Sequence, residues 1–222
     1  MIAGLLPAGV CAAEAFGDDG PAGRVALFPA EREAVAGVSP ERLREFTTVR
    51  GCARTALAGL GAAPAPLVPG RLGAPDWPAG VVGSMTHCAG YRAAAVAHGS
   101  AYASLGIDAE PLEPLPAVVA SRVVGAAERA WLRADFPPGA LPCDRLVFSA
   151  KEAAYKAFSP WLGARFGFQD FTVRPYPDGT FLVIPPETEM SLPALPEDGL
   201  VGRWSERSGI LLTSLLIQQR EI

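Results

Sequence analysis

Lysine is nearly absent from this sequence: the 222 residues contain only Lys151 and Lys156. Arginine carries the remaining basic charge, so solubility does not explain why these two positions keep lysine. A compact ammonium on a flexible stem meets an anion differently from the planar fork of arginine. Both lysines lie in one short stretch, Phe148-Ser149-Ala150-Lys151-Glu152-Ala153-Ala154-Tyr155-Lys156. On a helix, Glu152 and Lys156 share one face, where a solvated surface pair is the plain alternative to a site.

Cysteine, histidine and long apolar runs are also scarce. The four cysteines are widely scattered without a C-x-x-C pair and there are two histidines, which argues against a zinc site. Unpaired thiols in a reducing cytoplasm are the simpler interpretation. No stretch reaches the roughly 18–20 apolar residues that a membrane helix needs. The net charge of −4 argues against nucleic acid or a membrane surface as partner, but it leaves room for a local basic pocket.

What the chain does contain is apolar sequence, which makes up 50% of the residues and suffices for a sizeable core. The apolar run Met1–Ala13 has no basic residues of the kind that begin a signal peptide, so we expect it to start the folded domain. Strands are predicted at Val25–Phe28, Val81–Thr86, Tyr91–Ala97 (or a buried helix), Ala103–Ala109 (broken at Gly106), Phe171–Arg174, Phe181–Ile184, Gly199–Arg203 and Ile210–Leu216. Helices are predicted from Pro29, from Pro40 to about Leu60 with Ser39 as N-cap, at about Val118–Ala134 and at about Asp144–Phe158.

Two carboxylates end one of these strands, in Gly106-Ile107-Asp108-Ala109-Glu110. Residues i and i+2 of a strand point the same way, with backbones roughly 6.5–7 Å apart. Two acids converging on one point favour a cation, and magnesium prefers one or two carboxylates together with water and phosphate oxygens. Most such pairs are solvated strand ends, but Glu152 offers a third carboxylate from another element.

A second group of residues suits an anion. The segment Gly83-Ser84-Met85-Thr86-His87 exposes backbone N–H groups after a strand, and His87 can donate to a phosphate. Four arginines add to this group: Arg42, Arg50 and Arg54 near one face of the expected helix, and Arg71 in the loop after it. The fork of arginine matches two phosphate oxygens. Singly, each residue has a plain structural explanation; together with the acids and lysines they indicate a site for a magnesium-bound polyphosphate.

The two motifs in combination resemble the signature of 4′-phosphopantetheinyl transferases. Gly106-Ile107-Asp108-Ala109-Glu110 followed by Phe148–Lys156 matches the paired form G-[IV]-D-x-E and F-S-x-K-E-x-x-Y-K. Residues 44–54, 77–88 and Gly202-Arg203-Trp204 are similar to the enterobactin-synthetase and surfactin-type subgroup. The resemblance covers nearly the whole chain, with minor departures at Gly51 and Arg71.

This resemblance implies an α/β (α+β) fold with two similar halves related by pseudo-twofold symmetry, in a monomer with coenzyme A in the cleft between them. Residues 1–104 would form the half that holds the 3′-phosphate and adenine, and residues 105–222 the half with the metal site, the lysine helix and the carrier side. The implied enzyme, a holo-[acyl-carrier-protein] synthase, transfers 4′-phosphopantetheine from coenzyme A to a serine of an apo acyl or peptidyl carrier protein. It releases adenosine 3′,5′-bisphosphate and serves polyketide or nonribosomal peptide synthesis in secondary metabolism.

The resemblance also implies roles for individual residues. Asp108, Glu110 and Glu152 would bind Mg²⁺, with Mn²⁺ as an alternative, and Glu152 and Lys156 would be catalytic. Glu152 is the candidate base, and Lys156 stabilises the leaving phosphate. The residues expected to bind coenzyme A are Arg42, Arg50, Arg71, Thr86, His87, Lys151 and Lys156, with Arg42, Arg50 and His87 on the 3′-phosphate.

Carrier proteins are usually acidic around the modified serine, so a basic and apolar docking patch is expected near the cleft. The candidate region is Val118–Leu132, with Arg122, Arg129, Arg133, Val123 and Val124; an ordinary amphipathic helix explains it equally well. Two other functions also remain open at this point. A metal-dependent phosphohydrolase or nucleotidyl enzyme uses similar groups with water as acceptor, and a non-catalytic module binds coenzyme A or a carrier without turnover.

Overall fold

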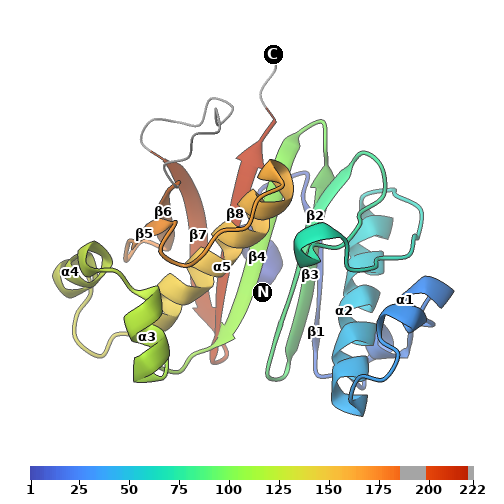
Figure 1. The fold of residues 1–222 in the computed structure, drawn as a ribbon, viewed down its shortest axis with the longest axis horizontal. Coiled ribbons are helices and arrows are strands. Elements are labelled where there is room, and N and C mark those ends of the chain that lie inside the picture. Colours follow the sequence, from blue (N-terminus) through green and yellow to red (C-terminus); the bar gives the residue numbers. More distant parts are fainter. Residues whose placement is uncertain (186–198, 220–222) are drawn as a thin grey trace.

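The computed structural model describes residues 1–185 and 199–219, apart from the side chain of Arg71. Two antiparallel sheets lie side by side, and each is covered by one long helix (Figure 1). The strands are β1 (Cys11–Phe16), β2 (Val81–Cys88), β3 (Tyr91–His98), β4 (Tyr102–Pro111), β5 (Thr172–Pro175), β6 (Thr180–Ile184), β7 (Leu200–Arg207) and β8 (Ile210–Gln218). The helices are α1 (Pro29–Ala34), α2 (Pro40–Gly59), α3 (Ala117–Val123), α4 (Ala126–Asp135) and α5 (Cys143–Leu162), with short 3-10 turns η1 (Ile2–Leu5), η2 (Pro21–Arg24) and η3 (Arg71–Gly73).

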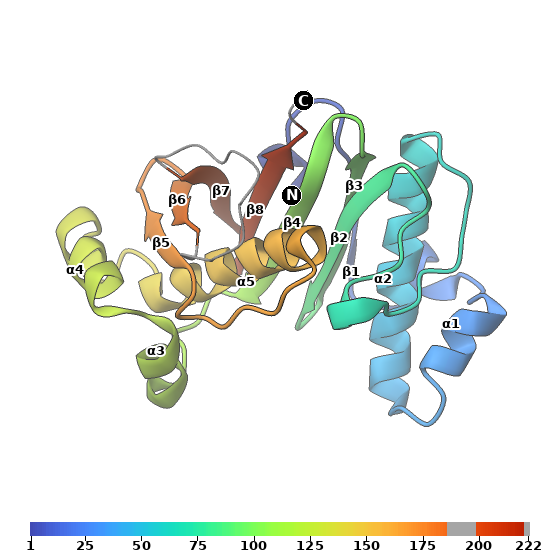
Figure 2. The ribbon, with the colours of Figure 1, turned by 45° about the horizontal axis from the view of Figure 1, so that its top comes forward.

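The first sheet has the order β1-β3-β2 and the second the order β4-β8-β7-β6-β5. Helix α2 packs on β1 and β3 of the first sheet, and α5 packs on β4 and β8 of the second (Figure 2). Helix α2 has the ends that its sequence predicts, whereas α5 continues four residues past the expected end at Phe158, to Leu162. Ser39 caps α2 by accepting the N–H of Arg42 at 3.2 Å, and left-handed glycines follow both helices, Gly61 (φ 79°) and Gly163 (φ 63°).

The two sheets meet edge to edge along β2 and β4, joined by side chains instead of a backbone ladder. The N–H of Ile107 donates to Ser84 Oγ and the N–H of Ala109 donates to Thr86 Oγ1, each at 3.1 Å. Ser84 and Thr86 are buried, so each hydroxyl satisfies a strand-edge donor that water does not reach. This junction fixes Thr86 beside Asp108, at the place where the acidic motif begins.

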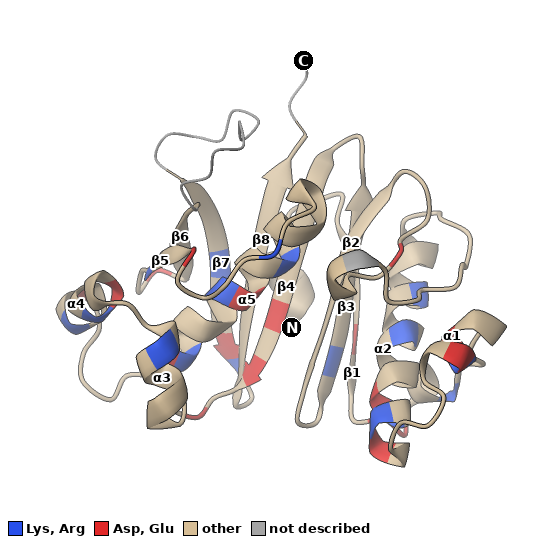
Figure 3. Cartoon of the chain, viewed as in Figure 1, with Lys and Arg blue, Asp and Glu red and all other residues tan. Residues whose placement is uncertain are grey.

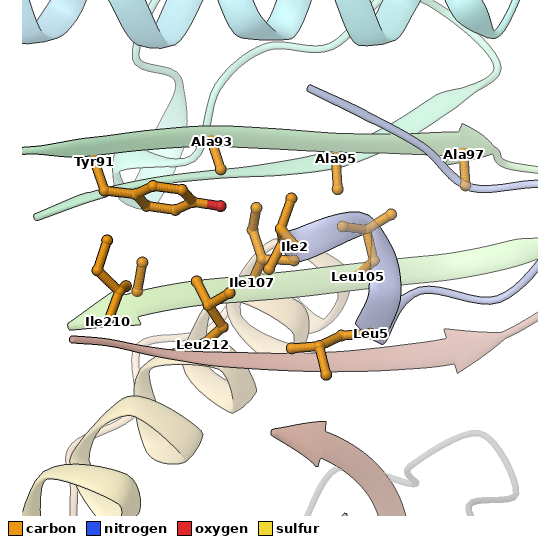
Figure 4. Packing of buried hydrophobic residues seen from close by; sticks show 11 residues of the cluster. Ile2, Leu5, Tyr91, Ala93, Ala95, Ala97, Leu105, Ile107, Ile210 and Leu212 are labelled. Atoms are coloured by element: carbon orange, nitrogen blue, oxygen red, sulfur yellow. The ribbon is translucent and has the colours of Figure 1, made fainter. Parts of the chain in front are cut away.

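A hydrophobic core is shared by the two halves (Figure 4). Ile2 and Leu5 of η1 insert between the sheets, where they meet residues of both. Tyr91, Ala93, Ala95 and Ala97 come from β3, Leu105, Ile107 and Ala109 from β4, and Ile210 and Leu212 from β8. The Met1–Ala13 run is therefore part of the folded core, as expected.

Three other expectations about elements are wrong, and one strand was missed. Residues Val25–Phe28 form no strand, because Arg54 and Arg32 bind the carbonyls of Ala26 and Leu27, and Glu31 binds the N–H of Phe28. The strand β1 was not predicted. The helical region at 118–134 is divided into α3 and α4 at Val124-Gly125. Strand β4 continues through Gly106, because that glycine lets α5 approach, not because it breaks the strand.

Candidate active site

The cavity of interest, about 310 Å³ in volume, lies between the two halves. Its walls come from α2, the loop around η3, strand β2 and helix α5. The lining side chains include Arg42, Phe46, Arg50, Leu72, Met85, His87, Glu152, Tyr155 and Lys156. Figure 3 shows arginines on α2, acids on β4, and both charge signs on α5. The cavity thus has a basic wall on α2 and approaches the acidic motif where β4 meets α5.

Asp108 is held by side chains of two other elements, β2 and α5. Its Oδ1 accepts from Thr86 Oγ1 of β2 at 3.1 Å and from Lys156 Nζ of α5 at 2.6 Å. Its Oδ2 accepts from Ser149 Oγ at 2.8 Å. Lys156 Nζ also donates to the carbonyl of Ile107 at 3.2 Å. The ammonium of Lys156 therefore pairs with Asp108, and not with Glu152 one helical turn away, as the helix spacing had suggested.

Glu110 is paired with Arg145, a residue that the sequence motifs did not single out. Arg145 Nη1 lies 2.6 Å from Glu110 Oε2, while its Nε donates to the carbonyl of Glu113 at 2.9 Å. Burial and the charge of Asp108 raise the pKa of Glu110, and Arg145 opposes this rise. Arg145 lies one helical turn before Ser149 on α5, and that spacing is the only signal in the sequence that could have identified it.

Glu152 faces the cavity and carries an elevated pKa. Burial is the main cause, and the charges of Asp108 and Glu110 add to it, while Lys156 acts in the opposite direction. A carboxylate of this kind accepts a proton more readily than an exposed glutamate does. Glu152 and Lys156 both line the cavity wall.

The chemistry of Asp108, Glu110 and Glu152 suits a divalent cation. Burial raises the pKa values of Glu110 and Glu152, and the negative charge of Asp108 raises both further. Hard carboxylate oxygens of this kind are preferred by magnesium. Across the described ranges, no group of three His, Cys, Asp or Glu side chains converges closely enough to enclose a metal ion. The donor set fits the ion, while Lys156 and Arg145 hold two of the three acids in this structure.

The basic wall brings Arg42, Arg50 and His87 together, as predicted. Arg42 Nη1 lies 2.7 Å from His87 Nε2, and a guanidinium can only donate, so this nitrogen of His87 is the acceptor. Burial, assisted by the charge of Arg42, lowers the pKa of His87, which agrees with a neutral ring. Arg50 is buried, stacks on Phe46 and has a pKa lowered by burial to about 10, so it remains charged at neutral pH.

Lys151 does not line this cavity, although the sequence had placed it near the phosphates. Its ammonium is buried and donates to Glu128 at 2.9 Å and to the carbonyls of Val123 and Phe168 at 2.8 Å. An ammonium has three N–H donors, and these contacts use all of them. The residue joins α3 and α4 to α5 and to the loop at Phe168, so its role in the structure is to hold these elements together.

Three other predicted residues have different outcomes. Thr86 is buried at the β2–β4 junction, where its hydroxyl serves Asp108 and the N–H of Ala109. Arg54 turns away from Arg42 and Arg50, since it pairs with the buried Glu31 and donates to the carbonyl of Ala26. Arg71 lies in η3 close to the cavity wall, but its side chain falls outside the described part of the structure.

Comparison with known proteins gives the class of protein. The profile of the 4′-phosphopantetheinyl transferase N-terminal domain matches residues 30–97, and that of the 4′-phosphopantetheinyl transferase superfamily matches residues 104–196. The two matches cover most of the chain in tandem. They agree with the α+β architecture of two halves described above, so the expected fold class is confirmed.

Three relatives match nearly the full chain. It is 47% identical to the 4′-phosphopantetheinyl transferase Svp of Streptomyces mobaraensis, over 98% of this chain and 89% of that protein. It is 44% identical to Npt of Nocardia iowensis (97% of this chain, 99% of that one) and 41% identical to PptT of Mycobacterium tuberculosis (98% of each). This chain therefore belongs to the 4′-phosphopantetheinyl transferase family, and the prediction of a transferase of this class is confirmed.

Proposed function

We propose that this protein transfers 4′-phosphopantetheine from coenzyme A to a serine of an apo acyl or peptidyl carrier protein. The observation that carries the proposal is one cavity with Arg42, Arg50 and His87 on one wall and Glu152 and Lys156 on another. The basic wall suits the 3′-phosphate of coenzyme A, because arginine binds phosphate oxygens in pairs. The acid and ammonium then lie where the pyrophosphate would react.

Asp108, Glu110 and Glu152 would hold Mg²⁺, with Mn²⁺ as an alternative of similar ligand preference. The ion, when bound, neutralises charge on the pyrophosphate. The protein supplies the other requirements. Thr86 and Ser149 fix the Asp108 carboxylate, and Arg145 fixes that of Glu110. Hydrogen bonds and ion pairs of this kind orient the carboxylates that would hold an ion.

The transfer itself needs a nucleophile, a base and a stabilised leaving group. The serine oxygen of the carrier attacks the β-phosphorus, and the bond from that phosphorus to the bridging oxygen breaks. The serine proton passes to Glu152, directly or through a water. Burial raises the pKa of this carboxylate, although a cation bound to it would weaken it as a base. Lys156 stabilises the charge that develops on the departing adenosine 3′,5′-bisphosphate.

The carrier is proposed to dock beside α3 and α4, although two expected contact residues do not belong there. Val123 and Val124 are buried in the protein core, whereas Val118 is 64% exposed and Arg122 is exposed as well. An exposed valine near an arginine is complementary to a carrier helix that has acidic side chains beside an apolar ridge. We propose that the enzyme serves polyketide or nonribosomal peptide synthesis, because residues 44–54 and 77–88 are similar to those of the enterobactin-synthetase and surfactin-type subgroup.

We further propose a monomer in the cytoplasm, divided near residue 104 into the two halves expected from the sequence. Cys11, Cys52, Cys88 and Cys143 are all free thiols, which suits a reducing compartment. Every helix within residues 1–185 and 199–219 is too short or too polar to cross a membrane.

The test is incubation of the purified protein with coenzyme A, Mg²⁺ and a panel of apo carriers, read by intact-protein mass. Transfer adds one phosphopantetheine arm to a carrier and requires Mg²⁺, so a chelator should stop it. Release of adenosine 3′,5′-bisphosphate without any carrier would favour a phosphohydrolase instead. Binding of coenzyme A with no turnover on any carrier would favour a non-catalytic module.

A further inference from the structure

A chain of alternating charges connects the interior of the first sheet to the basic wall of the cavity. It begins at Arg92 of β3, which is 5% exposed. Arg92 Nη1 donates to the carbonyls of Cys88 and Tyr91, and Nη2 lies 3.0 Å from Asp18 Oδ2. These three contacts hold the guanidinium independently of Glu45.

Glu45 of α2 is the next member of the chain. Its Oε1 lies 3.5 Å from Arg92 Nη2, and its Oε2 lies 3.1 Å from Arg42 Nη1 and 3.5 Å from His87 Nε2. The Arg42 side chain is 48% exposed, so without Glu45 its long stem would be free to sample many rotamers. Glu45 therefore connects a buried arginine to a partly exposed one.

We propose that Glu45 is a positioning residue of the phosphate end of the cavity and sets the preference for coenzyme A over 3′-dephospho-coenzyme A. This inference rests on the proposed function, in which Arg42 and His87 bind the 3′-phosphate. Glu45 holds the Arg42 guanidinium against His87, so that both face the phosphate together. The ordering is then completed before binding and does not reduce the affinity.

The negative charge of Glu45 also repels a phosphate, which acts in the opposite direction. Arg92 lies on the other oxygen of the same carboxylate and offsets this charge. Solvent at the exposed Arg42 screens what repulsion remains. Orientation of Arg42 is therefore the larger effect, and removal of Glu45 weakens discrimination.

The experiment compares kcat/KM for coenzyme A with kcat/KM for 3′-dephospho-coenzyme A on one carrier. In Glu45→Ala the ratio of the two kcat/KM values falls about tenfold, because KM for coenzyme A rises. The value of kcat stays within about twofold of the wild type, because the lost contact is remote from the reacting atoms. Glu45→Gln keeps an acceptor for Arg42 and restores the ratio to within about threefold of the wild type. Glu41→Ala, which removes an exposed carboxylate from the same helix, leaves the ratio unchanged.

An unchanged or increased ratio in Glu45→Ala would overturn the inference. So would an equal loss in an Arg42→Ala background, because Glu45 must act through Arg42. A general folding defect lowers kcat/KM for both substrates alike and leaves their ratio unchanged. Titration of the protein with adenosine 3′,5′-bisphosphate and with adenosine 5′-monophosphate measures the same preference without a carrier. Failure of transfer would therefore count against the proposed function alone, while these affinities would still decide the role of Glu45.

Discussion

At the scale of single residues, the two lysines have opposite roles that their positions in the sequence do not reveal. Lys151 and Lys156 lie on one helix among the same small apolar neighbours, and both were expected near the phosphates. The fold separates them, because Lys151 points toward Glu128 and Lys156 toward Asp108. The acid that would distinguish them, Glu128, has no signature in the sequence. The motif could predict Lys156 in the site but could not place Lys151 outside it.

Replacement of Lys156 with methionine should reduce turnover without unfolding the protein. Asp108 keeps its bonds from Thr86 and Ser149, so the local structure should hold. Loss of a charge that stabilises the leaving group typically costs about 10²–10³ in kcat. Steady-state rates of carrier modification would show this, with circular dichroism as the check on folding. A kcat within threefold of the wild type would contradict the role given to Lys156.

Replacement of Lys151 with methionine should instead destabilise the fold. Glu128 would still accept the N–H groups of Gly125 and Val173. It would lose the ammonium of Lys151, its only ion-pair partner among the described residues. Breaking a buried ion pair on one side costs about 3–5 kcal/mol. Urea denaturation measures the loss. The double variant Lys151→Met/Glu128→Leu should recover only part of it, because no buried charge is left alone but the N–H groups of Gly125 and Val173 lose their acceptor. A single-variant loss below about 1 kcal/mol would refute the account.

At the scale of elements, the close contact between β4 and α5 depends on one glycine. A Cβ at Gly106 would lie 2.0 Å from the carbonyl oxygen of Ala153 and 2.8 Å from the backbone nitrogen of Ala157. The sequence pattern predicted a strand here that is broken at Gly106. Only the packing of a helix onto that strand shows the need for it. The start of α2 was predictable because the cap at Ser39 is local, whereas this contact joins residues far apart in sequence.

Gly106→Ala should therefore lower both stability and activity. The atoms that the new methyl group meets are backbone atoms of α5, which cannot rotate away. Overpacking of this kind costs about 2–3 kcal/mol and would shift Asp108, two residues further along β4. Chemical denaturation and the Mg²⁺ concentration needed for half-maximal transfer would both report it. Gly20→Ala, with open space around its Cβ, is the matched control, and equal stability of the two variants would disprove the close-contact explanation.

At the scale of the whole molecule, the halves are united by features that no local pattern could predict. Strand β1 is rich in alanine, so its sequence shows little of the polar and apolar alternation that indicates a strand. The insertion of η1 between the sheets depends on strands that follow it by about ninety to two hundred residues. The carboxylate of Glu14 fixes this insertion, because it accepts from the N–H of Ile2 at 2.8 Å and from the Tyr91 hydroxyl at 2.6 Å.

Glu14 should make the stability of the whole protein depend on pH. Burial alone would raise the pKa of Glu14, but hydrogen bonds from the terminal ammonium, Tyr91 and Ile2 outweigh burial and bring the pKa below 4.5. A depressed folded-state pKa adds stability above the unfolded value and loses it as the pH falls through the folded value. Glu14→Gln should thus cost about 1–2 kcal/mol at pH 7, and this difference should shrink steadily below about pH 4.5. Urea denaturation of both proteins from pH 7 to pH 3 measures it, with the exposed Glu33→Gln as control. A difference that stays constant across this range would mean that the anchor of η1 does not depend on the charge of Glu14.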